Sequence, residues 1–495
     1  MKAAKTIALI LAALMLILAA VSCAKIGNNV ETTPAPTVTD AAPSAEPEAT
    51  TDGNLDEDGF LKDDLPEKFE YTDQFDILTW NNVQSWEWTT NYETTGDTIK
   101  DAIVKRQLSA EERTGVKINI TGMAGQWEAR NDFINAVVSS LAASGDQAYD
   151  LIGQYSFAAP IGTLRGAYVD LNNVKYLNLS QPWWPADITA SSLINGKCFF
   201  ATGDITCTLI RSMNCILTNL SLANDLKMPN FYELVDNKQW TAEKFLTYAT
   251  GTVTGLNPDG TQSYTTTLTD NVSYDNLFYA GGFHYVDLVD GNMEMSEDLD
   301  SVRMEDWYDL WSRFLKSNDD VGFLGVAGSN GFTSGNVLFH FGSIADVQNY
   351  LQDITFKFAI LPFPMYDENQ ENYCTICGAW VSYYSIPTNA PDEDMSGAVL
   401  EALASYGYRQ ITPAVYIASF QYRFLDSIEN ANVFDLLHNT LVFELGRQLG
   451  DQLNIFAAFR QAAQDTYSSW SSYYSGQKNA FNRTLTNIAK NPNIK

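Results

Sequence analysis

The sequence has few histidine and cysteine residues, and this scarcity limits the metal and disulfide chemistry it can carry. Its three histidines are far apart and none belongs to an H-E-x-x-H pattern, so a histidine-rich metal site is not expected. Besides Cys23 there are five cysteines: Cys198, Cys207, Cys215, Cys374 and Cys377. An odd number at irregular spacing is no disulfide framework, and the C-x-x-C pair lacks a second pair. We therefore expect buried thiols or one incidental disulfide.

The sequence also contains few basic residues relative to acidic ones. The 495 residues include 30 lysines and arginines against 60 aspartates and glutamates, which gives a formal charge of −30. Nucleic acids are bound through clusters of lysine and arginine, so such a partner is not expected. The simplest interpretation of the acidity is solubility. Hydrophobic residues make up 45% and aromatic residues 13%, which supports a large core and excludes global disorder.

Signatures of common enzyme classes are missing as well. There is no G-x-S-x-G elbow, since the nearest match, residues 331–335, has threonine at its centre. There is no Walker loop and no G-x-G-x-x-G following a strand. A secreted glycosidase needs only two carboxylates about 5–10 Å apart, however, and an acidic chain always offers candidates. The residues alone leave that alternative open.

The N-terminus has the pattern of an export signal. Lysines precede an apolar run from Ile7 to Val21, which is shorter than the roughly 20 residues of a membrane-spanning helix. Residues 20–23, Ala-Val-Ser-Cys, resemble a bacterial lipobox, with alanine in place of the usual leucine. The resemblance implies a signal peptide over residues 1–22 and lipidation of Cys23. The alternative is an ordinary signal peptide with an incidental cysteine.

Residues 23–66 differ in composition from the rest of the chain. They are rich in proline, alanine, threonine and acidic residues and have almost no apolar side chains to bury. This composition predicts a disordered tether that joins the lipidated cysteine to a folded domain. Folded sequence starts near Phe69.

The folded part alternates between strand and helix patterns. Strands are predicted at 75–80, 116–120, 149–152, 215–218, 338–341 and 358–361. Helices are predicted at 97–114, closed by Gly115, and at 128–143, 242–249, 303–315 and 394–405, with a mainly helical segment from Ala431 onward. Such alternation with short connections predicts an α/β fold with a parallel sheet covered by helices on both faces.

Four segments resemble the extracellular solute-binding proteins of ABC importers, family 1, the carbohydrate-type group. They are Gly166-Ala-Tyr-Val-Asp170-Leu171, then Leu193 to Lys197 followed by Ala201 to Asn219, then Trp240-Thr241-Ala-Glu-Lys244-Phe245, and finally Ile360 to Pro364 with Tyr383 to Pro387. Each motif is weak alone, but their order and spacing and the lipoprotein-like start are specific together. The resemblance covers residues 69–495.

This resemblance implies the type II periplasmic-binding-protein-like fold, with two α/β lobes joined by hinge strands. Lobe 1 is expected to comprise residues 67–205 and 365–410, and lobe 2 residues 206–364 and 411–495. The implied function is capture of a solute between the lobes by domain closure and its delivery to an ABC permease. The implied location is the outer face of the cytoplasmic membrane, where Cys23 anchors a monomer.

One departure from these relatives concerns a calcium-like loop. Residues 255–260 fall where relatives often have D-x-N-x-D-G, but the first position is Gly255 and the twelfth is Thr266. A hard cation needs six or more oxygens with carboxylates among them. The segment is therefore interpreted as a turn, and no metal or cofactor is expected.

Aromatic and polar residues near strand ends are the candidates for ligand contact, because in open α/β sheets ligands lie beyond the carboxyl ends of strands. A sugar needs aromatic platforms together with carboxylates, amides or arginine. The candidate residues are Trp80, Asn81, Trp86, Trp88, Tyr155, Asp204, Arg211 and Trp380. Three tryptophans within nine residues of a loop are hard to bury together, so at least one of them is expected to contact ligand, and local packing is the alternative. The pairs Trp183–Trp184 and Trp307/Trp311 are instead expected in the core.

An oligosaccharide is the favoured solute, given the aromatic content. The alternatives are a lipid-anchored glycoside hydrolase and a binding protein for peptides or other polar solutes. Neither the identity, length and linkage of the solute nor the partner permease can be inferred from the residues.

Overall fold

The computed structural model describes residues 55–494 except 57, 144–147, 254, 258–259, 269–271, 318, 328–330, 421–427 and 465–466. Its contacts divide the chain into Met1–Asp63 and Asp64–Lys495, and the second unit carries the fold described here. The expected signal peptide, Cys23 and the tether up to residue 54 lie outside the described residues. Within the part of the chain that is described, we find no helix both long and apolar enough to cross a membrane.

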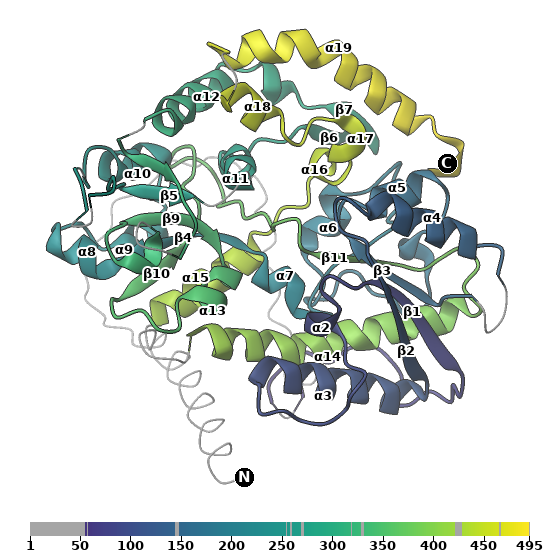
Figure 1. Ribbon diagram of the computed structural model, residues 1–495. Helices are drawn as coiled ribbons and strands as arrows, with labels where there is room; N and C mark the ends of the chain where they lie inside the picture. The colour runs from purple at the N-terminus through teal and green to yellow at the C-terminus, as the bar shows by residue number, and fades with distance from the viewer. Residues whose placement is uncertain are drawn as a thin grey trace, which may run out of the picture. The chain divides into compact units, whose positions relative to one another are not determined.

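The first sheet contains four strands in the order β11-β3-β1-β2 (Figure 1). Its members are β1 (Gln74–Trp80), β2 (Lys117–Met123), β3 (Leu151–Tyr155) and β11 (Ser382–Ser385). The first three run parallel, as their strand–helix alternation predicts, and β11 pairs antiparallel with β3. The crossover helices are α3 (Thr98–Thr114) and α4 (Arg130–Ser140), both close to their predicted bounds.

Local sequence fixes both ends of α3. The Asp97 side chain accepts hydrogen bonds from the backbone N–H groups of Ile99 and Lys100, which caps the N-terminus. Gly115 ends the helix with φ 85°, and a Cβ there would lie 2.2 Å from the carbonyl oxygen of Tyr71. The predicted glycine cap is thus confirmed, and β2 begins two residues later.

The second sheet contains five strands in the order β10-β4-β9-β5-β8. They are β4 (Asn214–Asn219), β5 (Thr266–Leu268), β8 (Val321–Phe323), β9 (Phe339–Ser343) and β10 (Phe358–Leu361). The predicted strands at 215–218, 338–341 and 358–361 are confirmed within two residues at each end. We call the body built on the first sheet lobe 1 and that built on the second lobe 2.

Helices complete both lobes. Two helices fit their predictions closely, α10 (Ala242–Ala249), capped by Thr241, and α12 (Val302–Leu315). A hairpin is formed by β6 (Val286–Val289) and β7 (Asn292–Met295). The other helices are α2 (Gln84–Glu87), α5 (Ala159–Leu164), α6 (Ala186–Ser191), α7 (Cys207–Arg211), α8 (Leu220–Asp225), α9 (Phe231–Asp236), α11 (Val272–Ala280), α13 (Ile344–Tyr350), α14 (Glu393–Phe420), α15 (Ile428–Asn439), α16 (Leu445–Gln448), α17 (Gly450–Leu453), α18 (Ala458–Gln464) and α19 (Trp470–Ala489). Short 3₁₀ turns lie at Leu171–Asn173, Glu297–Asp300, Phe332–Ser334 and Pro492–Ile494.

Tryptophans are prominent in the core, as expected for two pairs of them. Trp183 and Trp184 are buried, and both indole N–H groups donate to the carboxylate of Glu401 on α14, at 3.0 Å each. Trp307 and Trp311 are buried on one face of α12. Each buried indole removes a large apolar area from water, and the Glu401 carboxylate provides the hydrogen bonds that burial would otherwise forfeit.

Helix α14 is longer than the sequence predicts. It extends to Phe420 rather than ending near residue 405, and Pro413 lies inside it. In Figure 1 it runs alongside α3 of lobe 1 and reaches α13 of lobe 2. The lobe boundary proposed at residue 410 therefore falls within a continuous helix.

The chain passes between the lobes in segments that pair with one another. Residues 212–214 and 376–378 run antiparallel, with Gly378 N–H donating to the Ser212 carbonyl at 2.7 Å. Thr375 also pairs with residues 440–442, through N–H to carbonyl hydrogen bonds of 2.8 Å in both directions. Three crossing segments thus lie side by side between the two sheets.

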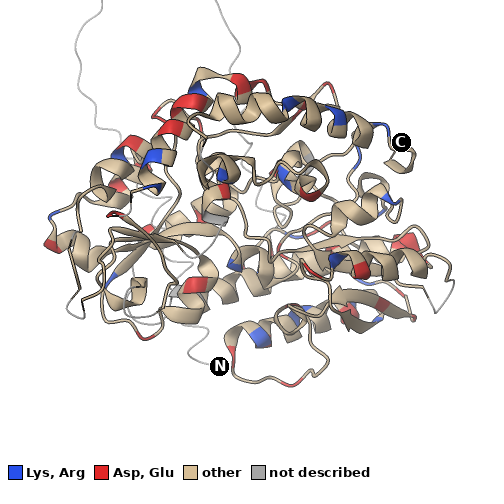
Figure 2. Cartoon of the chain, turned by 45° about the horizontal axis from the view of Figure 1, so that its top comes forward, with Lys and Arg blue, Asp and Glu red and all other residues tan. Residues whose placement is uncertain are grey.

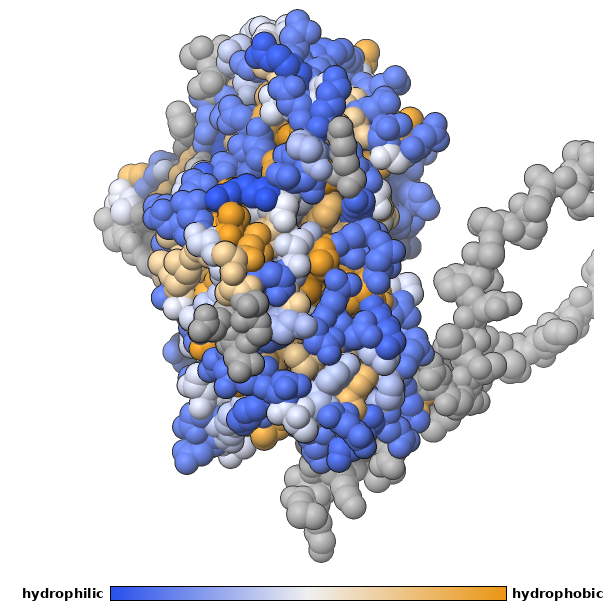
Figure 3. Space-filling view, turned by 90° about the vertical axis from the view of Figure 1, so that its right-hand side faces the viewer, coloured by the Kyte–Doolittle hydropathy of each residue, from blue (hydrophilic) through white to orange (hydrophobic). Residues whose placement is uncertain are grey.

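The surface carries scattered charge. Acidic and basic residues are distributed over helices and loops of both lobes (Figure 2). On the face shown in Figure 3, the described residues are mainly hydrophilic, and apolar ones form small separate groups. This distribution fits the interpretation of the acidic composition as a source of solubility.

The contact between α14 and the first crossing gives a test of the packing. A Cβ on Gly407 would lie 1.8 Å from the Asp204 carbonyl oxygen, so Gly407→Ala should destabilise the fold by about 1–3 kcal/mol. Gly476 in α19 has nothing within 4 Å, so Gly476→Ala should instead stabilise by about 0.5–1 kcal/mol. The urea midpoints of both variants check this. A wild-type midpoint for Gly407→Ala would contradict the packing described.

Candidate functional site

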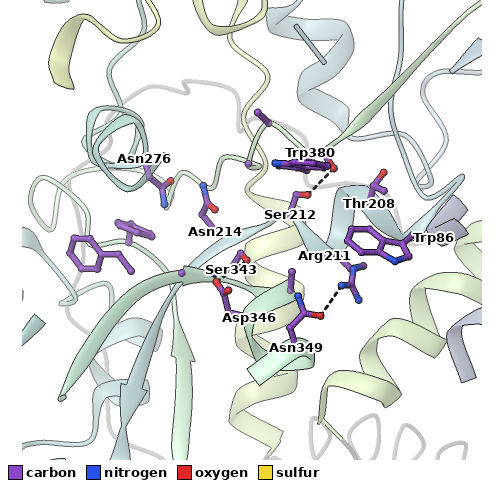
Figure 4. Close-up of a pocket in the computed structure, with 16 residues that line it drawn as sticks. Trp86, Thr208, Arg211, Ser212, Asn214, Asn276, Ser343, Asp346, Asn349 and Trp380 are labelled. Carbon is purple, nitrogen blue, oxygen red and sulfur yellow. Dashed lines mark hydrogen bonds between the residues drawn. The ribbon is translucent and has the colours of Figure 1, made fainter. Parts of the chain in front are cut away.

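A cavity of about 350 Å³ lies between the two sheets, at the crossing segments (Figure 4). Lobe 1 contributes α2 and the segment before β11, and lobe 2 contributes β9, α11 and α13. Helix α7 lies between them, in the first crossing, by which we mean residues 204–214, where the chain passes from lobe 1 to lobe 2. The lining residues are Trp86, Thr208, Arg211, Ser212, Asn214, Asn276, Phe341, Gly342, Ser343, Ala345, Asp346, Asn349, Phe363, Gly378, Ala379 and Trp380. Phe341 to Ser343 form the carboxyl end of β9, the edge at which α/β sheets bind ligands.

Two tryptophans give the cavity its aromatic surface. Trp86 on α2 and Trp380 before β11 are 42% and 48% exposed, unusually high values for indoles. The Trp380 ring lies 5.7 Å from the buried Trp80 ring, whose N–H donates to Ser382 Oγ at 2.6 Å. The Ser212 hydroxyl donates to the Trp380 carbonyl at 3.2 Å. The contact with Trp80 and the hydrogen bond from Ser212 fix the position of Trp380, while its indole remains exposed to the cavity.

Arg211 provides a positive charge at the end of α7. Its guanidinium carbon lies 4.8 Å from the centroid of the Trp86 ring, in a cation–π arrangement. One terminal nitrogen donates to the side-chain oxygen of Gln348, and the other donates to Asn349 Oδ1 at 3.2 Å. These contacts attach the first crossing to α13 of lobe 2.

Polar groups on the lobe 2 side are only partly satisfied. Among the described residues, the buried Asn214 Nδ2 and both side-chain amide atoms of the buried Asn276 have no hydrogen-bond partner. Asp346, by contrast, caps α13: its Oδ2 accepts from the Ser343 N–H at 2.8 Å and from the Ser343 hydroxyl at 3.0 Å. Buried amides without partners are costly, so their presence at a cavity wall indicates a polar ligand or ordered water.

A buried carboxylate accepts a hydrogen bond from Thr208, one of the residues that line the cavity. Glu87 Oε1 accepts hydrogen bonds from Thr208 at 2.6 Å and Thr206 at 3.1 Å. Burial raises the pKa of Glu87, against the opposing effect of these hydrogen bonds and of Arg106. Burial likewise lowers the pKa of Arg106 to about 10. Arg106 donates to the backbone carbonyl of Glu87 and stacks on Trp88 at 4.5 Å, and neither Glu87 nor Arg106 belongs to the cavity lining.

The structure brings together three of the residues predicted to contact ligand, namely Trp86, Arg211 and Trp380. Trp80 and Trp88 are buried and lie outside this lining, because β1 includes Trp80 and Trp88, at the end of α2, packs against Arg106. Of the three tryptophans near this loop, the structure places Trp86 in the cavity. Asn81 and Trp88 instead line a separate cavity of about 460 Å³ between α2 and α3.

Tyr155 and Asp204 lie behind the cavity lining. Tyr155 is 5% exposed and packs against Trp80 at 5.1 Å, so it supports the ring that supports Trp380. Asp204 is fully buried, and its Oδ1 lies 3.1 Å from Nε2 of His438 on α15. The structure thus places Asp204 at a link between the first crossing and α15.

Sequence reasoning missed the lobe 2 side of the cavity. Asn214 begins a buried strand, Asn276 lies in an apolar helix, and Asn349 is near the end of a short one, so each looks like an ordinary structural residue. The one signal in the sequence that could have identified these residues is a polar side chain within a helix or strand that is otherwise apolar. An asparagine in a helix as apolar as α11 has no reason to be buried without a partner.

No metal-binding cluster of three or more His, Cys, Asp or Glu side chains occurs among the described residues. Of the suspected calcium-like loop, Pro258 and Asp259 lie outside those residues, and Asn257 N–H donates across the turn to Thr261. The five cysteines beyond Cys23 are free thiols, and all but Cys374 are buried. Burial raises the pKa of Cys377 to about 12, so it is an unreactive thiol at neutral pH.

No family model matches the sequence, and no curated protein matches it by sequence. Solved structures do resemble it. UgpB from Mycobacterium tuberculosis, solved with glycerophosphocholine, matches at 13% identity and TM-score 0.55, over 84% of this chain and 98% of that one. The cyclic α-maltosyl-1,6-maltose binding protein of Arthrobacter globiformis matches at 14% identity and TM-score 0.53, over 84% and 99%.

A family 1 extracellular solute-binding protein from Bifidobacterium longum subsp. infantis matches at 14% identity and TM-score 0.50, over 84% of this chain and 99% of that one. The chain therefore spans nearly the whole length of these proteins and shares their fold. The two-lobed α/β fold that the sequence resemblance implied is confirmed.

The pair of Asp204 and His438 predicts a pH dependence of stability. Burial lowers the pKa of His438, but the charge and hydrogen bond of Asp204 outweigh this, so the net shift is upward. A raised folded pKa stabilises the fold below about pH 6.5, and this gain is lost as the pH rises through the raised value.

His438→Gln should therefore cost about 1–3 kcal/mol at pH 6, with a smaller cost at pH 9. Urea unfolding of both proteins across this range measures the difference. His284→Gln serves as a comparison at a half-buried pair: burial lowers the pKa of His284, Asp287 and other nearby carboxylates raise it more, and the cost should change with pH in the same direction. An equal cost of His438→Gln at both pH values would refute the charged pair.

Proposed function

We propose that this chain captures a polar solute, most favourably an oligosaccharide, in the cavity between its lobes and delivers it to an ABC permease. The fold supports the proposal, since it is that of extracellular solute-binding proteins. Two of the similar structures are of proteins that bind a cyclic maltose saccharide or glycerophosphocholine. The chemistry of the cavity is the independent support.

The observation that carries the proposal is the pairing of exposed indoles with unsatisfied polar groups in one cavity. Trp86 and Trp380 offer apolar faces to the C–H surface of a sugar ring. Asn214, Asn276 and Arg211 offer directional hydrogen bonds to its hydroxyls. Open aromatic rings and orphaned buried amides are both costly for a protein without a ligand, and one sugar would satisfy both.

The mechanism proposed is domain closure. Trp86 and Trp380 come from lobe 1, whereas Asn276 and Asp346 come from lobe 2, so full contact with a solute requires both lobes. The paired crossing segments at 212–214 and 376–378 provide the hinge. Because only the closed state makes both sets of contacts, the solute shifts the population towards it.

A glycoside hydrolase is the second candidate function, and the cavity gives it little support. Retaining and inverting glycosidases use two carboxylates on either side of the scissile bond. Among the described lining residues Asp346 is the one acidic side chain, and it caps α13. A peptide or another polar solute remains compatible with the same amides and indoles.

For location, the proposal is an exported lipoprotein held at the outer face of the cytoplasmic membrane through Cys23. Its support is the sequence pattern of residues 1–23 together with a fold found in extracellular solute-binding proteins. The acidic, proline-rich segment after Cys23 would serve as a tether.

Removing either indole should weaken sugar binding. Trp380→Ala and Trp86→Ala should each lower affinity by about tenfold or more, because each removes an aromatic platform worth about 0.5–1.5 kcal/mol beyond its buried area. Calorimetry of the purified protein against linear and cyclic gluco-, manno- and xylo-oligosaccharides measures this.

Tyr350→Ala is the matched control, since Tyr350 is an exposed aromatic on α13 outside the cavity lining. Its affinity should equal that of wild type. Equal binding by Trp380→Ala would place the site elsewhere, and turnover of a bound oligosaccharide would favour the hydrolase.

Lipidation is tested at the cysteine itself. Cys23→Ala should move the protein from the membrane fraction to the soluble fraction of cells, because stable anchoring needs the acyl chains. Mass spectrometry of the wild-type N-terminus should show an acylated Cys23. An unmodified N-terminus on a soluble wild-type protein would exclude the anchor.

A further inference from the structure

Arg211 is a cation that the described protein leaves without a negatively charged partner. Its two terminal nitrogens donate to the neutral side-chain oxygens of Gln348 and Asn349, and its guanidinium lies over Trp86. Among the described residues, its buried Nε–H has no acceptor. Arg130, by comparison, forms a two-pronged ion pair with Asp451 at 3.0 and 3.1 Å.

The amides of the same cavity add to this surplus of donors. Asn214 Nδ2 and Asn276 Nδ2 lack acceptors within the described part of the chain, and both side chains are more than nine-tenths buried. Against these donors stands one acceptor without a donor, Asn276 Oδ1. A sugar hydroxyl brings its own donor along with its lone pairs, whereas a carboxylate or phosphate brings acceptors alone.

The acidic groups nearby are already committed. Asp346 lines the cavity, but its Oδ2 accepts two hydrogen bonds from Ser343 at the start of α13. Glu87 lies outside the lining, and its Oε1 accepts hydrogen bonds from Thr208 and Thr206. Among the described lining residues, Arg211 is the one cationic side chain and Asp346 the one acidic side chain, and no ion pair joins the two. A guanidinium of this kind binds an oxyanion through charge-assisted hydrogen bonds.

We propose that the solute is an acidic saccharide, whose oxyanion binds at Arg211 while its sugar rings lie against Trp86 and Trp380. This proposal rests on the proposed function and narrows its substrate class. The stacking of Arg211 on Trp86 places the positive charge beside an aromatic platform. A sugar ring that carries a carboxylate or phosphate presents the same two features, an apolar face and an anionic edge.

Matched pairs of ligands test the proposal by calorimetry on the whole protein. Trigalacturonate is compared with its neutral methyl ester, and glucose 6-phosphate is compared with glucose. The acidic member of at least one pair should bind about tenfold tighter or more, with an affinity that falls as NaCl rises from about 50 to 500 mM. The uronate pair and the phosphate pair distinguish a carboxylate from a phosphate.

Variants then assign the preference to one side chain. Arg211→Gln should bring each acid within about twofold of its neutral partner, and Arg211→Lys should keep part of the preference, since the point charge persists. Arg165→Gln is the control, because Arg165 donates to Asn135 outside the cavity and should leave binding unchanged. Thermal unfolding of each variant confirms that it folds.

The outcomes separate the two proposals. Neutral oligosaccharides that bind as tightly as the acids, with affinity lost in Trp380→Ala, would overturn the acidic class and leave solute capture intact. A preference for acids that persists in Arg211→Gln would also overturn it. Failure of every neutral and acidic saccharide to bind would overturn the proposed sugar capture itself.

Discussion

The antiparallel pairing of residues 212–214 with 376–378 is the constraint on which the cavity depends. These two segments carry the chain between lobes in opposite directions, and their hydrogen bonds hold them side by side. Arg211 lies one residue before the first segment, and Trp380 lies two residues after the second. Both residues therefore line the same cavity, although 169 positions separate them in the sequence. The hydrogen bond from Ser212 to the Trp380 carbonyl adds a direct link. The site is therefore built where the lobes are joined, and a bend at the joint changes the site.

Elements with strong local signals could be predicted from the sequence. The helix ending at Gly115, the capped helix at 242–249 and the strand at 358–361 arise from end signals and short-range hydrophobic patterns, and the structure has them within a residue or two. Helix α14 shows the limit. Its extension past residue 405 depends on packing against α3 and α7, which are distant in sequence, so tertiary contacts and not local propensity decide where it ends.

The candidate site was accessible from sequence on one lobe only. Tryptophan and arginine near strand ends stand out by residue type, which is how Trp86, Arg211 and Trp380 could be found. Burial, however, is set by the whole chain: Trp80 and Trp88 lie within a few residues of Trp86 in sequence, yet Trp80 is buried with a hydrogen bond to Ser382 and Trp88 is buried against Arg106. The asparagines of lobe 2 have no distinctive pattern at all. Asn214 and Asn276 can be recognised as candidate ligand-binding residues only from the structure, which shows amide atoms without hydrogen-bond partners at a cavity wall.

The two lobes also meet away from the paired segments. Arg130 at the start of α4 pairs with Asp451 of α17, and Asn491, beyond α19, donates to the Leu164 carbonyl at the end of α5. Figure 1 shows α19 running from the region of α12 towards α5, so the C-terminal segment contacts both lobes. An opening motion that separates α4 from α17 would expose the half-buried Arg130–Asp451 pair, which regains water as it loses its partner. The proposed opening would also break the hydrogen bond from Asn491 to Leu164 and the ring contacts of Phe456 with Trp127 and Phe157. A solute that drives closure therefore has to act together with these contacts, and the balance between the open and closed states depends on more than one ion pair.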